Sequence, residues 1–108
     1  MPHFALLVYE RAPGGFADLP ADVLAAHGQV EARITASGGA LVAGYATRSD
    51  QDTYTLRDRS VAQGPFAPAD ASLAGLLVVD ARDLEHAVHI ADYIPTLDGG
   101  VEVRPLLG

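Results

Sequence analysis

His27 is the residue whose type and spacing best suit chemistry in this chain. It lies four residues after Val23 and three before Val30, so a helix would place it on an aliphatic stripe that faces the core. A buried imidazole needs hydrogen-bond partners, and its ordinary pKa of about 6.5 suits a general base at neutral pH. We therefore predict His27 as a catalytic or ligand-binding residue. The alternative is a core histidine whose nitrogens bond to backbone or tyrosine groups.

Further polar and aromatic side chains could line a binding site. Glu10 and Arg104 lie at the ends of the first and last predicted strands, where they would form an ion pair or border a cleft beside the loop at residues 11–19. Tyr45 and Arg48 could line the same cavity. The predicted ligand-binding residues are Tyr9, Glu10, Arg11, Gln63, Phe66 and Arg104.

His86 and His89 form an arrangement that could be read as a metal site. Their spacing of three puts both on one helical face, with Asp83 and Asp92 nearby. A solvated helix face explains the same spacing, and we adopt that interpretation. The sequence has no cysteine, no phosphate-binding glycine loop, no nucleophile elbow and no zinc motif, so we predict neither a metal nor a cofactor.

Composition and charge exclude several classes of protein. At 108 residues and 49% hydrophobic, the chain is expected to form one globular domain over residues 1–108. Its 7 arginines, absence of lysine and 14 acidic residues give a net charge of −7, which would repel a nucleic-acid backbone. No apolar run approaches the roughly 20 residues that cross a bilayer, and the N-terminus lacks a secretory pattern. We therefore expect a cytoplasmic protein that binds neither nucleic acid nor membrane.

Hydrophobic periodicity and turn signals divide the chain into strands and two helices. Strands are predicted at residues 3–9, 40–47, 53–57, 73–80 and 101–105, with a short return strand at 60–63, and helices at residues 20–37 and 83–94. The second and third strands are expected to pair as a hairpin. In the second helix, Asp83 is the predicted cap, and the residues expected to face the core are Leu84, Ala87, Val88 and Ala91.

This order of elements predicts an α+β fold, a ferredoxin-like sheet with an inserted β-hairpin and two helices on one face. The strands at residues 3–9 and 73–80 nevertheless carry apolar side chains on both faces. Helices on one face would leave the other apolar face in water, which is unusual for a monomer. We therefore predict a homodimer in which two sheets face each other, as in a dimeric α+β barrel.

Four features in the second half of the chain occur together in a known family, namely Gln63-Gly64-Pro65-Phe66, the apolar strand at 73–80, the helix that ends before Ile94-Pro95, and the closing strand at 101–105. With these features the chain resembles the DGPF subgroup of the YCII-related family, and the resemblance covers nearly its whole length. It implies a dimeric α+β barrel. Gln63 stands where the subgroup has aspartate, and most of that tetrapeptide is expected to shape the turn and pack, with a ligand contact by Gln63 as the alternative.

The resemblance also bears on His27. In better-understood members, including a dehydrochlorinase of chlorinated hydroxyhydroquinone, a histidine on the first helix pairs with an aspartate just before the proline that ends the second helix. His27 matches that histidine, but Ile94 stands at the position of the aspartate. Asp92 lies two residues earlier and would point to a different side of the helix. The dyad is therefore not expected in its usual form.

Two hypotheses follow. The first is a homodimer that binds a small, aromatic or oxygenated organic molecule between the first helix and the sheet, with His27 as the polar contact. If it is an enzyme, cofactor-independent proton transfer of the lyase or isomerase type suits one histidine in an apolar cavity. The alternative is a non-catalytic accessory or regulatory module, because the resemblance associates such proteins with bacterial extracytoplasmic-function sigma factors.

Overall fold

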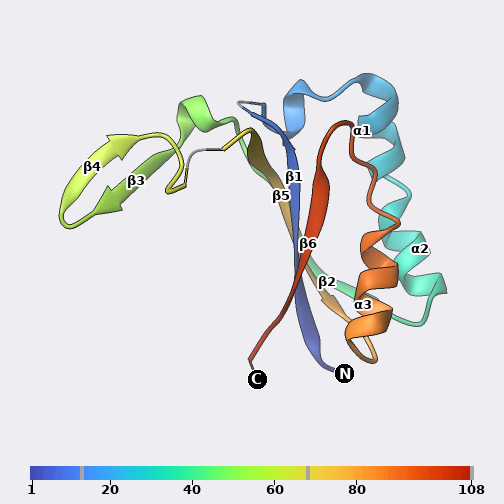
Figure 1. Ribbon diagram of the computed structural model, residues 1–108. Coiled ribbons are helices and arrows are strands. Elements are labelled where there is room, and N and C mark those ends of the chain that lie inside the picture. The colour runs from blue at the N-terminus through green and yellow to red at the C-terminus, as the bar shows by residue number, and fades with distance from the viewer. Residues whose placement is uncertain (13, 68, 108) are drawn as a thin grey trace.

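Four antiparallel strands form one sheet in the order β2-β5-β1-β6, and the helices pack on one of its faces (Figure 1). The sheet consists of β1 (His3–Arg11), β2 (Ala40–Ala46), β5 (Ala71–Asp80) and β6 (Gly100–Pro105), and the helices are α1 (Ala21–His27), α2 (Val30–Ala36) and α3 (Leu84–Ala91). A separate hairpin contains β3 (Tyr54–Arg57) and β4 (Ser60–Gln63), and two 3-10 turns are η1 (Phe16–Asp18) and η2 (Asp50–Asp52). The predicted ferredoxin-like α+β fold is confirmed.

This computed structural model describes residues 1–12, 14–67 and 69–107. Pro13, which belongs to the loop predicted at residues 11–19, lies outside the described residues, as do Pro68 and Gly108. Within those ranges, no helix has both the length and the apolar character needed to span a membrane.

The core lies between the sheet and the helices. Alternation along β1 turns Phe4, Leu6 and Val8 toward the helices, and all three side chains are buried. In the neighbouring strand β5, Val79 lies opposite Phe4 and Leu77 lies opposite Leu6. The helices complete this core with buried aliphatic side chains, namely Val30, Ile34 and Ile90.

The predicted helix over residues 20–37 is interrupted. It forms α1 and α2, with Gly28 and Gln29 between them. Both residues keep right-handed helical dihedral angles, but the N–H of Gly28 bonds to the carbonyl of Ala25 at 3.1 Å, which is the tighter 3-10 spacing. Glycine is among the weakest helix formers, and it loosens the helix at the point where His27 ends α1.

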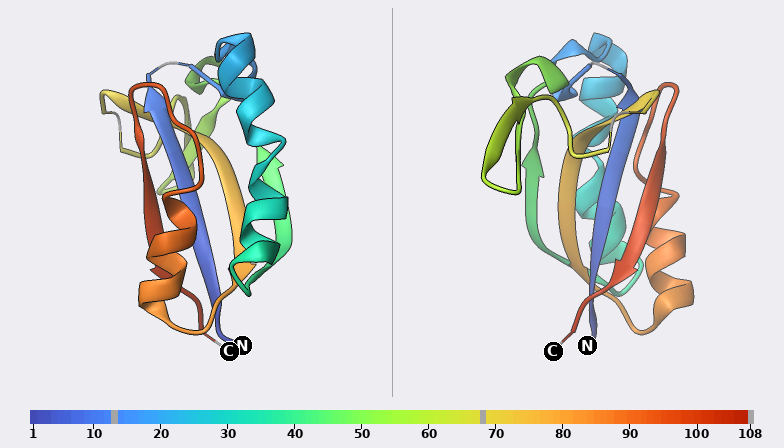
Figure 2. Two further views of the ribbon diagram at one scale, coloured as in Figure 1. Left: turned by 90° about the vertical axis from the view of Figure 1, so that its right-hand side faces the viewer. Right: turned by 60° about the vertical axis from the view of Figure 1, so that its left-hand side comes forward.

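The expected pairing of the second and third strands is wrong. The strand β2 pairs with β5 in the main sheet, whereas β3 pairs with β4. The turn between β3 and β4 has positive φ at both central residues, 49° at Asp58 and 68° at Arg59, as in the type I′ turn that suits a tight hairpin. This hairpin projects from the side of the sheet opposite the helices (Figure 2). We refer to residues 54–63 as the arm.

The face of α3 that enters the core differs from the prediction. Leu84 and Val88 are exposed, and the buried side chains of this helix are His86, Ala87, Ile90 and Ala91. The predicted cap is confirmed, since Oδ1 of Asp83 accepts a hydrogen bond from the backbone N–H of His86 at 2.8 Å. The error arose because His86 was assigned to the solvated face, although its ring is 4% exposed.

The face of the sheet turned away from the helices is not covered by any helix or strand of the described residues. Alternation places Leu7, Leu76 and Val78 there on the two central strands, where they are partly exposed. Tyr45 on the edge strand β2 lies opposite Leu76 and is 68% exposed. We refer to this surface as the open face.

Candidate functional site

A cavity lies between α1, the η1 turn and the sheet. Its volume is about 180 Å³. The wall of the cavity is mostly apolar, and His27 contributes its imidazole ring to it. The residues that form the wall are Val8, Phe16, His27, Gly44, Tyr45, Ala46, Gly75 and Leu77. Two of these residues are glycines, so backbone forms part of the wall. Apolar walls with one convergent polar group are typical of sites that bind small molecules.

His27 is only partly satisfied by its surroundings. Its ring meets the edge of Phe16 at a centroid distance of 4.9 Å and an interplanar angle of 73°. Its Nε2 atom is buried and has no hydrogen-bond partner within the described part of the chain. A buried polar atom without a partner costs free energy, so this nitrogen is a group that a ligand could satisfy.

The pKa of His27 lies below its ordinary value of 6.5 because burial disfavours the charged ring. The backbone carbonyl of Pro95 and the negative charge of Glu10 raise the pKa of His27 and so oppose this effect in part. The ring is therefore neutral at pH 7. A neutral imidazole carries its proton on one nitrogen and a lone pair on the other, so with the proton on Nδ1 the unpartnered Nε2 offers a lone pair.

Glu10 is a buried carboxylate on the same side of the sheet as His27. It continues the alternation of β1 that turns Val8 toward the helices, and it is 4% exposed. Its Oε2 atom accepts a hydrogen bond from the N–H of Leu97 at 2.8 Å, and its Oε1 atom accepts one from the N–H of Asp98 at 3.0 Å. Glu10 therefore fixes the loop after α3 to the end of β1.

Gly99 permits this loop to lie against β1. A Cβ atom at position 99 would lie 1.7 Å from the carbonyl oxygen of Tyr9, so every other residue would push the two segments apart. The same loop contains Pro95, whose carbonyl acts on His27. The end of β1, the loop after α3 and the end of α1 thus meet at His27.

The other border of the cavity is the η1 turn. The backbone N–H of Phe16 donates to the carbonyl of Thr47 at 3.2 Å, which docks the turn on the end of β2. Gly15 permits this close approach, because a Cβ atom at position 15 would lie only 2.7 Å from backbone atoms of Arg48 and Ser49. The carboxylate of Asp18 holds the turn by accepting from the N–H of Gly15 at 3.0 Å.

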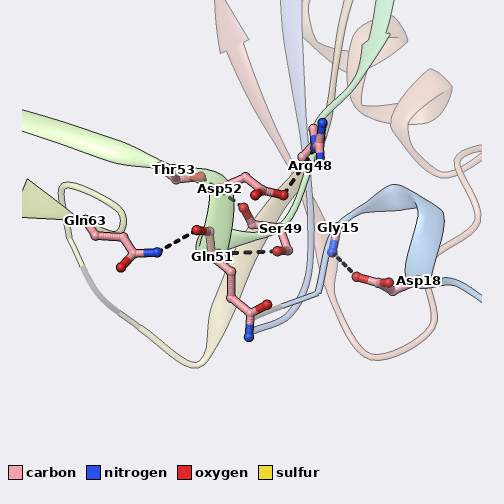
Figure 3. Close-up of polar contacts among 8 residues, drawn as sticks. All are labelled: Gly15, Asp18, Arg48, Ser49, Gln51, Asp52, Thr53 and Gln63. Carbon is pink, nitrogen blue, oxygen red and sulfur yellow. Dashed lines mark hydrogen bonds and ion pairs between the residues drawn. The ribbon is translucent and has the colours of Figure 1, made fainter.

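A polar cleft of about 330 Å³ adjoins the cavity and shares Phe16 and Ala46 with it. Figure 3 shows the contacts on its two sides, Gly15 with Asp18 on one and Arg48 with Asp52 on the other. The Arg48–Asp52 ion pair measures 3.1 Å and is largely exposed, so it contributes little to stability. Charged side chains, those of Asp18, Arg48 and Asp52, therefore line the cleft beside the cavity.

The predicted pairing of Glu10 with Arg104 is wrong. In the antiparallel register of β1 and β6, Arg104 lies opposite Ala5, whereas Glu10 lies beyond the pair formed by Tyr9 and Gly100. The two side chains are therefore at opposite ends of the strand pair. Arg104 instead pairs with Glu102.

The remaining predicted ligand-binding residues lie away from the His27 cavity. Tyr9 is on the open face, opposite Leu73, and Arg11 is exposed at the end of β1. Gln63 is in the arm, where its Nε2 atom donates to the carbonyl of Gln51 at 2.6 Å (Figure 3). Phe66 does not fill the core, because it is 66% exposed. Of the six, the structure brings only Glu10 near His27.

His86 has a structural arrangement that leaves neither ring nitrogen free. The N–H of Arg82 donates to Nδ1 at 3.0 Å, so Nε2 carries the proton and donates to Oγ of Ser37 at 3.1 Å. Ser37 in turn donates to the carbonyl of Ile34 at 2.7 Å. A wide groove of about 1060 Å³ runs past His86 and His89, but no cluster of three or more metal-ligating side chains occurs within the described ranges.

Comparisons with known proteins give one positive result. No curated protein matches the sequence. A model of the YCII-related domain matches residues 3–107, which is nearly the whole chain. This range contains all four strands of the main sheet, the arm and the three helices. The chain therefore belongs to the YCII-related domain family.

Proposed function

We propose that this protein binds a small organic molecule in the cavity beside His27. The observation that carries the proposal is the buried Nε2 atom of His27, which lacks a partner at the wall of an otherwise mostly apolar cavity. A volume of about 180 Å³ suits a molecule with one ring, since a cavity of about 150 Å³ holds benzene in another protein. The adjoining polar cleft would favour a ring that carries hydroxyl or other polar substituents.

The same site is suited to proton transfer. A neutral imidazole with a lone pair on Nε2 can accept a proton from a bound molecule, and its lowered pKa keeps it neutral at pH 7. Glu10 supplies a nearby negative charge that would stabilise the imidazolium formed in this step. Ile94 cannot do so, because its side chain is aliphatic and buried. If the protein is an enzyme, the reaction is a cofactor-independent elimination or isomerisation.

The active assembly in this proposal is a homodimer. The open face presents Leu7, Leu76, Val78 and Tyr45, which the described part of the chain leaves partly or largely exposed. A second copy related by two-fold symmetry would cover these side chains with the same surface. We also assign the chain to the DGPF subgroup, on the basis of the turn Gln63-Gly64-Pro65-Phe66 at the base of the arm.

A thermal-shift screen tests the binding site. The probes are catechol, hydroxyquinol, benzoate and zinc, added to the wild type, to His27→Ala and to the matched control His89→Ala, which removes an exposed histidine. A probe present at tenfold its Kd adds about 1.4 kcal/mol to the free energy of unfolding and raises Tm by several degrees. We expect an aromatic probe to raise Tm in the wild type and in the control, and not in His27→Ala.

Two outcomes would contradict the proposal. Equal shifts in all three proteins would place the bound probe away from His27. If no probe raises Tm while His27→Ala merely lowers the stability of the free protein, His27 is a core residue. The second outcome would favour the alternative of an accessory module, which a pull-down with an extracytoplasmic-function sigma factor would then examine.

A further inference from the structure

The arm carries a row of large apolar side chains in water. Tyr54, Leu56 and Val61 are 68%, 67% and 68% exposed. Leu56 lies opposite Val61 in the β3–β4 register, and Tyr54 is two residues from Leu56, so the three share one face of the hairpin. An exposed cluster of this kind on a two-stranded hairpin indicates an interaction surface.

The base and the turn of the arm are well defined by hydrogen bonds. Oγ1 of Thr55 donates to the carbonyl of Gly64 at 2.8 Å, the N–H of Gly64 donates to the carbonyl of Thr53 at 2.7 Å, and the side chain of Gln63 bonds to η2. Nevertheless, an isolated two-stranded hairpin is only marginally stable in water and gains stability when one face packs on a further layer. Among residues 1–12, 14–67 and 69–107, none provides such a layer for the apolar face of the arm, whose side chains are about two thirds exposed.

The direction of the arm indicates which molecule could provide that layer. The arm extends outward on the side of the sheet that bears the open face (Figures 1 and 2). When two open faces meet across a two-fold axis, each arm extends past its own sheet and alongside the other copy. The same operation brings both arms to the partner at once, because the interface is symmetric.

The charge of the arm also fits a second copy of this chain. Residues 54–63 contain Arg57, Asp58 and Arg59, which gives the arm a charge of +1, and since the whole chain carries −7, the rest carries −8. The positively charged arm therefore meets an acidic body on any second copy. Complementary charges of this kind steer association and fix orientation.

We propose that the face of each arm formed by Tyr54, Leu56 and Val61 packs against the rim of the open face of a second copy and clasps the dimer. This inference rests on the proposed homodimer and adds the surface that holds it together. The body of the partner gives the arm its missing layer, and the arms enlarge an interface that the open faces alone would form.

A matched pair of substitutions tests the arm. Val61 and Ala62 are adjacent and both exposed, but alternation places them on opposite faces of β4. Sedimentation velocity over a range of concentrations should give a dimer Kd at least tenfold higher for Val61→Glu than for the wild type, while Ala62→Glu stays within about twofold of the wild type. Both variants add one negative charge, so the difference reports the face and not the charge.

A second measurement uses the absence of cysteine from the chain. In the single-cysteine variants Val61→Cys and Ala62→Cys, the rate of thiol alkylation should fall at least fivefold at dimer-forming concentrations at position 61 and stay unchanged at position 62. If the wild type dimerises and Val61→Glu and Ala62→Glu have the same dimer Kd, the clasp is wrong and the homodimer stands. If the wild type stays monomeric, the clasp and the homodimer are both wrong. Neither result bears on ligand binding at His27.

Discussion

The pH dependence of His27 follows from its burial. Because the folded protein holds the pKa of His27 below 6.5, the unfolded chain takes up a proton on this residue at a higher pH than the folded chain. The free energy of unfolding therefore falls as the pH decreases from 6.5 through the lowered pKa. Above pH 6.5 the His27 ring is unprotonated in both the folded and the unfolded state, so the stability that depends on a neutral His27 is fully present there.

Glu10 should control both this pKa and the local stability. In Glu10→Gln the negative charge near His27 is lost, so we expect the pKa of His27 to fall further. The variant should also lose about 1–3 kcal/mol of unfolding free energy, because charged hydrogen bonds to the N–H groups of Leu97 and Asp98 become neutral or are broken. NMR titration of the His27 ring and urea denaturation measure the two effects.

The control for this variant is Glu31→Gln, which neutralises an exposed glutamate on α2. It should leave the pKa of His27 and the stability close to the wild-type values. If Glu10→Gln leaves the His27 titration where it was, Glu10 acts only as a structural support for the loop after α3.

At the level of elements, the sequence was sufficient wherever a local pattern decided the outcome. The apolar run at residues 3–9 predicted β1, and Asp83 marked the start of α3. Strand pairing was not decided locally: a turn at Asp58-Arg59 joins β3 to β4, while β2 finds its partner in β5, more than 20 residues further along the chain. The buried ring of His86 was missed because its bond to Ser37, which is distant in sequence, is tertiary.

The site was predictable only in part. Helical spacing turned His27 inward, and the alternation of β1 could have placed Glu10 on the same side of the sheet. Glu10 was instead expected to pair with Arg104, because both lie at strand ends. Phe16 was noted only as part of a loop, since no periodicity places a loop residue against a helix. Tyr9 is separated from the other two because it lies on the open face, whereas Gln63 is in the arm and Phe66 is exposed just after it.

The η1 turn is held in place by the small size of Gly15, and Gly15→Ala should displace it. A Cβ at this position would lie 2.7 Å from the backbone of Arg48 and Ser49, which cannot rotate away as a side chain could. We expect a loss of about 1–3 kcal/mol in unfolding free energy, together with weaker binding of any probe held near Phe16. Denaturant unfolding and the probe titration measure these effects.

Gly100→Ala is the matched control for this substitution, because a Cβ at position 100 would have no atom within 4 Å and its φ is not in the left-handed region. It should change stability by less than about 1 kcal/mol. A Gly15→Ala protein as stable as this control would show that the η1 turn adjusts freely and is not a fixed wall of the cavity.

On the scale of the whole molecule, the arm and the open face account for an extended shape. The radius of gyration is 14.5 Å, compared with about 13 Å for a compact chain of roughly this length. One layer of helices leaves the open face in water, and the arm projects from that side. Both features place apolar side chains where the second copy of the proposed dimer would cover them.

Leu76→Glu should therefore break the proposed dimer while each chain keeps its fold. Leu76 lies between Leu7 and Tyr45 on the open face, so a carboxylate there would be buried against its two-fold copy without a partner. We expect the dimer Kd to rise at least tenfold, about 1.4 kcal/mol, in sedimentation equilibrium, and Tm to lose its dependence on protein concentration. The control Leu84→Glu alters an exposed leucine on the helix layer and should dimerise as the wild type does. Equal behaviour of the two variants would mean that the open face is not the dimer interface.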